Sequence, residues 1–574
     1  MGWSFLPGMG LAMFTLCGVG TAALPNIVYI LTDDLGIGDV SGYNPAAKTA
    51  TPAMDGLMKE GIRFTDAHSG SAVCTPTRYG ILTGRYCWRS SLKTGVLNAK
   101  SKHLTEDGRL TAATMLKQKG YATACIGKWH LGLDWADAQD WSKGFTKGPG
   151  TVGFEYYYGI SASLDMEDYA YLQNGHTVES PTDSIKGSGW PAFWRAGKIA
   201  PGFKHVEVLP NVTAKAVAWI QGRMAEPAKP FFLYLPLPSP HTPHVPNAAF
   251  KGKSQAGDRG DYVEETDWAV GRVVKTLDSL GLAKNTLLIV TSDNGAHDNT
   301  YKQFGHTPHM GFRGEKADIF EAGHRIPFIV RWPGVAKAGS VSPEVVCLTD
   351  FLATAAAITS VKLPDDAGED SYSLLPVLLG RVLKAPLREA TVHHSINGTF
   401  AIRKGDWKLS VDNLGSGGFT DPQTVAGPGS LFDMAKNPGE DSLKDLYADK
   451  PAVVKELRDL LAKYKADGRS VALPRNDEFW EGTTAIRGGN PADGTRLRLH
   501  QSGPDLVVSG AGEGPYAAVI RGLDGVRVFG LTGSSMGDLR LRPQELPPGL
   551  YVLEISGDGW AGRTALVVDG RNPR

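Results

Sequence analysis

The chain has 574 residues, and its 60 lysine and arginine residues equal its 60 aspartate and glutamate residues, so the formal net charge is zero. A protein without a basic excess lacks the electrostatic signature of nucleic-acid binding, so we expect no nucleic-acid partner. An anionic substrate would need a local cationic site, because the net charge offers no long-range attraction. The length predicts two to four domains with a large core.

Residues 1–23 are uncharged and apolar, and they end in small residues. This pattern predicts a signal peptide. A membrane anchor is the alternative, because the run is long enough to span a bilayer. Glycines interrupt the run, however, and Leu16 before Cys17 disfavours a lipoprotein. The sequence therefore predicts an exported protein, periplasmic, cell-surface or extracellular, with no stable membrane insertion after cleavage.

The first strand expected after this segment is residues 26–31, a continuous apolar run typical of a strand buried on both faces of a parallel sheet. Asp33 and Asp34 follow it directly. Two carboxylates in this position are costly unless a cation or hydrogen-bond donors compensate them. A helix cap or a turn explains one of them easily but explains the pair less well.

A second apolar run, residues 285–292, is followed by Asp293 and Asn294. Alone, the Asp-Asn-Gly sequence is more often a turn. Sites in open α/β sheets lie at the carboxyl ends of strands, so two strands that end in oxygen ligands are more informative than one. Such ligands suit Ca²⁺, or Mg²⁺ if the cavity is tighter.

Between these two runs, residues 71–85 read as a loop that enters a helix, with Cys74 at the junction and Arg78 four positions later. A thiol at a helix N-terminus near a guanidinium would have a lowered pKa and could be a nucleophile. The alternative is a buried loop cysteine. Four cysteines remain after residue 23, too few for a disulfide scaffold: Cys74, Cys87, Cys125 and Cys347.

Other segments place cationic and acid/base groups after predicted strands or within loops. Lys128 and His130 follow an apolar run, His241 lies in a proline-rich loop after another, and Lys316 lies in a glycine-containing loop. Each has an ordinary alternative, because a lone lysine is usually solvated and a lone histidine is usually a satisfied core or surface residue.

Taken together, these segments resemble a known family. The Cys-x-Pro-x-Arg pattern at 74–78, followed by Leu-Thr-Gly-Arg at 82–85, is similar to the signature of the type I, formylglycine-dependent sulfatases of the alkaline phosphatase superfamily, the arylsulfatase-like enzymes. The Asp-Asp, Gly-Lys-Trp-His and Asp-Asn-Gly segments follow in that family's order, and the resemblance runs from about residue 25 to 475. It implies that a maturation enzyme oxidises Cys74 to formylglycine, whose hydrate is the nucleophile.

The resemblance also implies a role for each candidate residue. One Ca²⁺ ion would be bound by Asp33, Asp34, Asp293, Asn294 and the converted Cys74. Lys128 and Lys316 would bind sulfate oxygens, Arg78 and His130 would hold the formylglycine hydrate, and His241 would protonate the departing alcohol. A sulfate monoester is anionic and repels nucleophiles, so a divalent cation and lysines are needed to neutralise charge in the transition state.

The expected fold is α/β, with a doubly wound, largely parallel central sheet in a catalytic domain at 24–390 and a smaller C-terminal α+β subdomain at 391–480. Residues 481–495 read as a linker. Short β-type runs punctuated by glycine and proline predict an appended small all-β sandwich at 496–574. Its last strands resemble the C-terminal sorting domains of secreted bacterial enzymes.

The resulting functional prediction is hydrolysis of sulfate monoesters, with a sulfated carbohydrate of galactose or N-acetylgalactosamine type, or an aryl sulfate, as substrate. A phosphatase or phosphonate hydrolase on the same fold is one alternative, although such enzymes typically use threonine or serine where this chain has Cys74. A noncatalytic sulfated-glycan binder is the other, if Cys74 is unconverted. Pocket loops are predicted at 135–194 and 297–309, whose aromatic residues either pack or stack on sugar rings.

Overall fold

The computed structural model describes residues 24–473, except 138–139, 298–300 and 421–424, and, beyond residue 473, the strands of the C-terminal region. It divides into a larger compact unit, Ala23–Gly482, and a C-terminal unit that begins at Thr483. The predicted signal peptide lies outside the described residues. No helix in the described part of the chain is long and apolar enough to cross a membrane.

The larger unit is built on a ten-stranded sheet in the order β15-β2-β14-β13-β1-β12-β4-β7-β8-β9. Its middle is parallel and consists of β13 (Thr286–Ser292), β1 (Asn26–Thr32), β12 (Phe231–Pro236), β4 (Ala122–Lys128) and β7 (Tyr156–Ile160). Antiparallel pairs occur on both sides of it, among β14 (Phe328–Arg331), β2 (Ile62–Phe64), β8 (Leu172–Gln173) and β9 (His176–Thr177), while β15 (Ser340–Ser342) runs parallel to β2. The largely parallel central sheet is therefore confirmed.

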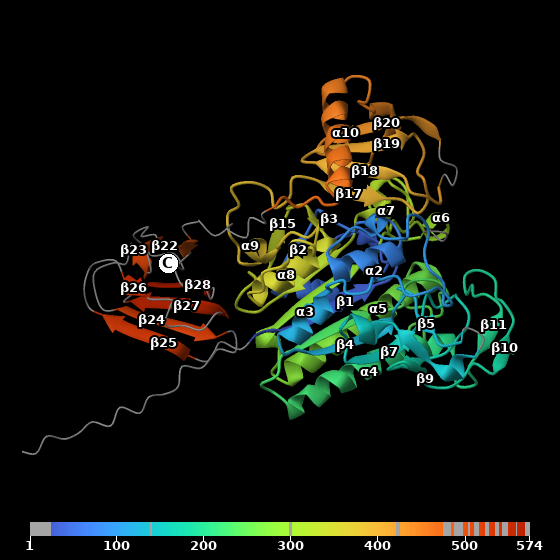
Figure 1. The fold of residues 1–574 in the computed structure, drawn as a ribbon, viewed down its shortest axis with the longest axis horizontal. Helices are drawn as coiled ribbons and strands as arrows, with labels where there is room; N and C mark the ends of the chain where they lie inside the picture. Colours follow the sequence, from blue (N-terminus) through green and yellow to red (C-terminus); the bar gives the residue numbers. More distant parts are fainter. Residues whose placement is uncertain are drawn as a thin grey trace, which may run out of the picture. The chain divides into compact units, whose positions relative to one another are not determined.

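Helices flank this sheet in two groups (Figure 1). One contains α2 (Cys74–Thr83), α3 (Ala112–Gln118) and α8 (Phe351–Ile358), and the other contains α1 (Pro52–Glu60), α4 (Val208–Gly222) and α5 (Gly257–Ser279). Because β1, β4, β12 and β13 are buried along their whole length, as strands covered on both faces are, the doubly wound arrangement follows from their apolar sequences.

The smaller elements of this unit are short turns of helix and strand pairs. The pairs are β3 (Ala67–His68) with β16 (Val346–Cys347), β5 (Asp134–Trp135) with β6 (Phe145–Lys147), and β10 (Asp183–Ile185) with β11 (Gly197–Ile199). The short helices are α6 (Tyr301–Phe304), α7 (Glu321–His324) and α9 (Leu375–Leu378).

One part of the sequence prediction is wrong. The segment 135–194 is not a continuous pocket loop, because β7 within it is the fifth parallel strand of the sheet. Three consecutive tyrosines have high strand propensity. Gly159 lets β7 pack closely on β4, since a Cβ there would lie 1.8 Å from the Gly127 carbonyl oxygen.

The predicted α+β subdomain is confirmed at the end of the larger unit. Four antiparallel strands form its sheet, β17 (Thr391–His394), β18 (Phe400–Lys404), β19 (Trp407–Asn413) and β20 (Ala426–Asp433). Helix α10 (Pro451–Ala466) buries Val454, Leu457 and Leu461 in a common core with this sheet. The spacing of these residues, three and then four, is that of one helix face.

The C-terminal unit contains two antiparallel four-stranded sheets (Figure 1). One is β21 (Thr484–Ile486), β22 (Leu497–Ser502), β23 (Asp505–Ser509) and β26 (Leu539–Leu541). The other is β25 (Arg527–Gly533), β24 (Tyr516–Gly522), β27 (Gly549–Gly557) and β28 (Trp560–Val568). The all-β character expected here is confirmed, but β21 falls inside the segment read as a linker, because it pairs with β22.

Candidate active site

Four of the predicted ligand residues meet at the carboxyl ends of β1 and β13. The parallel register pairs Thr32 with Ser292, so the residues that follow the two strands lie side by side. The Asp34 N–H donates to Asp293 Oδ1 at 3.2 Å, and Asn294 Nδ2 donates to Asp34 Oδ1 at 2.7 Å. All four side chains, those of Asp33, Asp34, Asp293 and Asn294, are buried.

The oxygen atoms of this cluster are suited to bind a hard divalent cation. Asp33 Oδ1 and Asn294 Oδ1 are buried and have no hydrogen-bond partner among the described residues. Asp33, Cys74 and Asp293 offer ligand atoms that all lie within 4.8 Å of one another. Burial and the nearby charge of Asp33 raise the pKa of Asp293 to about 7, although the charge of Arg78 acts in the opposite direction. The carboxylates of the cluster therefore repel one another. Carboxylate and amide oxygens are ligands for Ca²⁺ or Mg²⁺.

Two cationic side chains neutralise the charge of these carboxylates. Arg78 donates from Nε and Nη2 to Asp293 Oδ2, at 3.0 and 2.7 Å, and from Nη1 to the Lys128 carbonyl oxygen at 2.9 Å. Lys128 Nζ donates to Asp33 Oδ2 at 2.6 Å. Burial alone would raise the pKa of Asp33, but the charge of Lys128 above all holds it well below its ordinary value.

Lys316 and His241 both lie near the same oxygen of Asp34. Lys316 Nζ donates to Asp34 Oδ2 at 2.8 Å, and His241 Nε2 lies 3.7 Å from the same oxygen. His241 Nδ1 lies 2.7 Å from the Thr242 carbonyl, which can only accept, so Nδ1 carries the proton and Nε2 is the nitrogen that faces the site. Burial and the charge of Lys316 lower the pKa of His241.

Cys74 begins helix α2 and is only 2% exposed. Burial raises the pKa of its thiol, and this effect outweighs the opposing charges of Lys128 and Lys316. Of the two sequence-based interpretations of this cysteine, a lowered thiol pKa is therefore wrong and a buried cysteine is confirmed. The physical reason is that Cys74 is enclosed by the protein and that the Arg78 guanidinium pairs with Asp293.

His130 lies next to these groups with one ring nitrogen available. Its Nε2 donates to the Leu97 carbonyl oxygen at 2.7 Å, which leaves Nδ1 buried without a partner among the described residues. Burial and the charge of Lys128 lower its pKa well below the ordinary range, so the ring is neutral. His130 and Asp34 have φ values of 57° and 64°, a left-handed conformation that is strained for residues other than glycine and clusters at functional sites.

Sequence reasoning missed two charged residues beside the site. Asp165 Oδ1 lies 3.9 Å from His241 Nδ1 and is buried without a hydrogen-bond partner among the described residues, while its other oxygen pairs with Arg195. Arg259 on α5 donates to the Asp34 carbonyl oxygen at 3.2 Å and to the Asp39 carboxylate at 2.6 Å. Asp165 lies in the segment 135–194 predicted to line the pocket, but the sequence assigns it no role, and nothing in the local sequence indicates Arg259.

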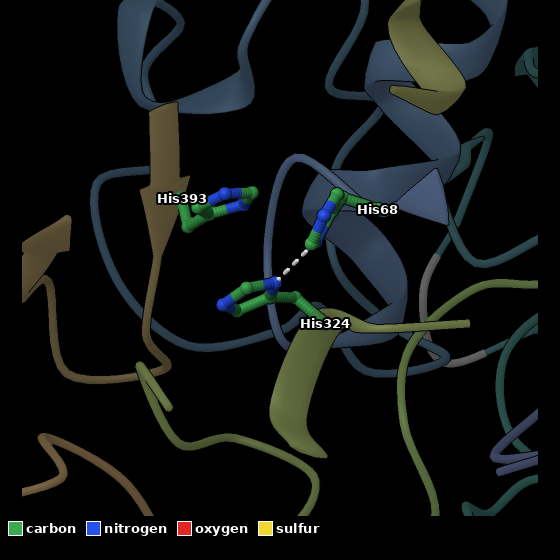
Figure 2. A group of neighbouring side chains, drawn as sticks. All are labelled: His68, His324 and His393. Atoms are coloured by element: carbon green, nitrogen blue, oxygen red, sulfur yellow. Dashed lines mark hydrogen bonds between the residues drawn. The ribbon is translucent and has the colours of Figure 1, made fainter. Parts of the chain in front are cut away.

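A second cluster, His68, His324 and His393, also has the composition of a metal site (Figure 2). The rings of His324 and His393, however, stack face to face, 3.8 Å apart and 7° from parallel. Imidazole lone pairs lie in the ring plane, so two stacked rings cannot both point at one ion. His68 Nδ1 and His324 Nδ1 instead share a hydrogen bond at 3.0 Å, and burial lowers the pKa of His68 to about 4. The cluster is a neutral contact that links β3, α7 and β17.

The family model described as Sulfatase matches residues 25–361. An N-acetylgalactosamine-6-O-sulfatase of Bacteroides thetaiotaomicron is 36% identical over 492 residues, covering 77% of this chain and 93% of that protein. Human arylsulfatase A is 32% identical over 464 residues, covering 77% and 88%.

Solved structures agree with these matches. A Bacteroides thetaiotaomicron structure, reported in work on glycosaminoglycan metabolism, has a TM-score of 0.70 and 35% identity and covers 78% of this chain and all of that one. A sulfatase from Pseudoalteromonas sp. has a TM-score of 0.63 and 25% identity, covering 77% and 90%. With the family match spanning more than half of its length, the chain belongs to the sulfatase family and is a sulfuric ester hydrolase.

Proposed function

We propose that the protein hydrolyses sulfate monoesters through a formylglycine formed from Cys74, with one Ca²⁺ held by Asp33, Asp34, Asp293 and Asn294. The observation that supports this most is that Asp33 Oδ1 and Asn294 Oδ1 are buried without hydrogen-bond partners among the described residues, in a cluster on which two lysines also converge. The Ca²⁺ would supply charge neutralisation and polarisation of a sulfate oxygen. The hydrated aldehyde would supply the nucleophilic oxygen.

The lysines are suited to hold the sulfate group. Lys128 and Lys316 each direct one hydrogen bond at a carboxylate oxygen, and an ammonium group has three donors, so further donors remain for sulfate oxygens. Both side chains are buried, which strengthens their interaction with an anion relative to water. They would stabilise charge that develops on the sulfuryl oxygens in the transition state.

His130 and Arg78 would position the reacting side chain at 74. The neutral His130 ring has its Nδ1 lone pair available to accept a proton from a hydroxyl group, because Nε2 is fixed as the donor to Leu97. Arg78 holds the start of α2 against Asp293 and so fixes the position of residue 74 relative to the carboxylates.

His241 would protonate the departing sugar oxygen from Nε2. A bound sulfate ester adds negative charge beside the ring, which favours the protonated form that burial alone disfavours. The Nδ1–H bond to the Thr242 carbonyl orients the ring so that Nε2 points at the site. Lys316, 2.8 Å from the same carboxylate oxygen that His241 approaches, is the alternative donor.

We propose a sulfated carbohydrate of galactose or N-acetylgalactosamine type as substrate, supported by the 36% identity to an N-acetylgalactosamine-6-O-sulfatase. The test is to measure free sulfate released from a panel of defined sulfated saccharides by protein produced with a formylglycine-generating enzyme. Release from a galactose-type sulfate is the expected result. Faster turnover of phosphate monoesters would favour a phosphatase, and saccharide binding without turnover by protein that carries the aldehyde would favour a glycan binder.

We also propose that the protein is exported and that residues 1–23 are removed. The support is the apolar, uncharged sequence of that segment and its small residues at the end. The C-terminal unit would then serve sorting or attachment rather than hydrolysis. N-terminal sequencing of protein recovered from the producing cells would test the cleavage, since an intact Met1 would contradict it.

A further inference from the structure

Two aromatic rings are exposed next to the candidate active site. Trp190 and Phe419 are each 43% exposed, and they are the aromatic residues with this degree of exposure in the part of the chain that the structure describes. A single exposed apolar side chain needs no explanation. These two, however, come from distant segments and flank the same residue, His297, with ring centroids 6.3 Å (Trp190) and 5.1 Å (Phe419) from its ring.

Both rings are connected to segments that carry the proposed sulfate-binding and acid groups. His297 Nδ1 lies 3.2 Å from Glu315 Oε2, and Glu315 precedes Lys316 in the chain. On the other side, Trp190 packs edge-on against the ring of His244, with centroids 5.0 Å apart, and His244 lies in the same proline-rich loop as His241. The aromatic rim, defined here as Trp190, His297 and Phe419, therefore lies at the border of the site.

The backbone around Phe419 is held firmly. A Cβ on Gly418 would lie 2.4 Å from the carbonyl carbon of Ala317, so the backbone before Phe419 packs directly on the residue that follows Lys316. On the other side, Thr420 donates from its N–H and its hydroxyl to the Asp318 carboxylate, at 3.2 and 2.7 Å. A segment fixed in this way loses little backbone entropy when a ligand stacks on the Phe419 ring.

We infer that the aromatic rim is a second subsite that takes the pyranose ring next to the sulfated sugar of a glycan. Pyranose rings present C–H groups on one face, which pack on aromatic rings, and hydroxyl groups at their edge, which can bond to polar side chains such as Glu315. The area of two rings is far smaller than the roughly 800 Å² that each partner contributes to a stable protein interface, so the rim is too small to be the docking site of a protein. The inference rests on the proposed sulfated-carbohydrate substrate.

This subsite predicts that the enzyme binds longer substrates better. Loss of one stacking ring should raise the KM for an oligosaccharide about tenfold, since aromatic contacts of this kind contribute on that scale. It should leave a sulfated monosaccharide unaffected, because that substrate does not reach the rim. The difference between the two substrates, rather than the activity itself, is the signature of the subsite.

The experiment uses the full-length converted protein and two probes, N-acetylgalactosamine 6-sulfate and a chondroitin 6-sulfate tetrasaccharide with that sugar at its non-reducing end. We expect Trp190→Ala and Phe419→Ala to raise the KM for the tetrasaccharide about tenfold at unchanged kcat, with kcat/KM for the monosaccharide unchanged. Phe419→Tyr keeps the ring and should behave as wild type. Met224→Ala, which removes a side chain that is also 43% exposed, on the short helix after α4, is the matched control.

Equal losses on both probes, no loss on the tetrasaccharide, or a wild-type KM that is no lower for the tetrasaccharide would each overturn the subsite. If wild type releases sulfate from neither probe, the proposed substrate is wrong. Binding of the tetrasaccharide, measured by saturation-transfer NMR, then tests the subsite independently of turnover. Transfer from the protein to the tetrasaccharide that disappears in Trp190→Ala supports the subsite. Equal transfer in both proteins, or none in wild type, overturns it.

Discussion

Arg78 donates two hydrogen bonds to a single carboxylate oxygen, Oδ2 of Asp293, while the backbone N–H of Asp34 donates to the other oxygen of that carboxylate. One aspartate thus joins helix α2, which begins at Cys74, to the ends of strands β13 and β1. Asp293 therefore fixes the start of helix α2 relative to the carboxylate cluster.

The first prediction concerns removal of the metal. Chelation should abolish turnover and lower the Tm. Without the metal, the carboxylates of Asp33 and Asp293 repel each other in a buried site. The stabilisation that is lost is also that of a bound ligand, which at 100 times its Kd stabilises the folded state by ~2.7 kcal/mol. Added Ca²⁺ should restore both, which thermal unfolding and sulfate release can follow together. Full occupancy by zinc in the purified protein, with activity that survives calcium removal, would contradict the assignment.

The second prediction concerns Cys74. Peptide mass spectrometry should find the aldehyde at residue 74 in active protein, and Cys74→Ala should lower kcat by at least ~10⁴-fold, since the nucleophile is lost. The variant should fold with nearly the wild-type Tm, because the exchange removes only the sulfur atom of Cys74 or the oxygen atoms of the formylglycine that replaces it. The matched control is Cys125→Ala, a buried thiol on β4 that has no proposed role in the chemistry and should retain turnover. Turnover by protein that carries only the free thiol at 74 would refute the mechanism.

The third prediction assigns proton donation to His241. General acid catalysis contributes ~10²–10⁴-fold, and it matters most when the leaving oxygen is basic. His241→Ala should therefore lose activity on that scale against a sugar sulfate and far less against nitrophenyl sulfate, whose leaving group departs unaided. Comparing kcat/KM for the two substrates measures this. If the two losses are equal, His241 only orders its loop, and Lys316 becomes the next candidate.

The fourth prediction is that stability decreases in acid through the buried histidine cluster. The folded protein keeps His68 neutral down to a pKa of about 4, whereas the unfolded chain takes up the proton near 6.5. The unfolded state thus binds more protons between these values, so stability is complete above about pH 6.5 and is lost as the pH falls towards 4.

This loss amounts to roughly 3 kcal/mol for one fully buried histidine. Thermal unfolding across this pH range measures it. His393→Phe should reduce the fall of the Tm at acid pH, because it removes one of the titrating rings. His176→Phe, at an exposed position on β9, should leave the dependence of the Tm on pH unchanged. Parallel curves for wild type and His393→Phe would show that the cluster does not titrate as expected.

The fifth prediction concerns the C-terminal unit. A chain that ends at Gly482 should keep kcat/KM within about twofold, because the compact unit boundary falls there and every candidate site residue precedes it. The cut must come before β21, which belongs to the C-terminal sheets. A truncated protein with the wild-type Tm of the larger unit but no turnover would mean that the C-terminal unit contributes to the reaction.

The parts of the site that the sequence predicts are those fixed by local patterns. The runs that became β1 and β13 are continuous and apolar, and once they pair in parallel, Asp33 and Asp293 must lie together. Cys74 and Arg78 are close in sequence, so their place at the start of a helix follows from the loop that precedes them.

What the sequence cannot predict depends on the packing of distant segments. Arg259 pairs with Asp39, 220 positions away, so no local pattern indicates that it also donates to the Asp34 carbonyl oxygen. The raised pKa of Cys74 arises from burial, which is a property of the assembled fold. The tyrosine run of β7 cannot be told from a pocket loop by its sequence, because aromatic residues serve both cores and ligand sites.

The burial of Cys74 sets an order of events during synthesis. With the side chain only 2% exposed, a second enzyme cannot reach it once helix α2 has packed. Under the proposed formylglycine mechanism, oxidation and folding would compete for the same newly made chain, and each molecule that folds first would stay inactive without being misfolded. The active fraction of a preparation would then report the ratio of two rates, so raising the amount of the maturation enzyme should raise specific activity without changing the yield of folded protein.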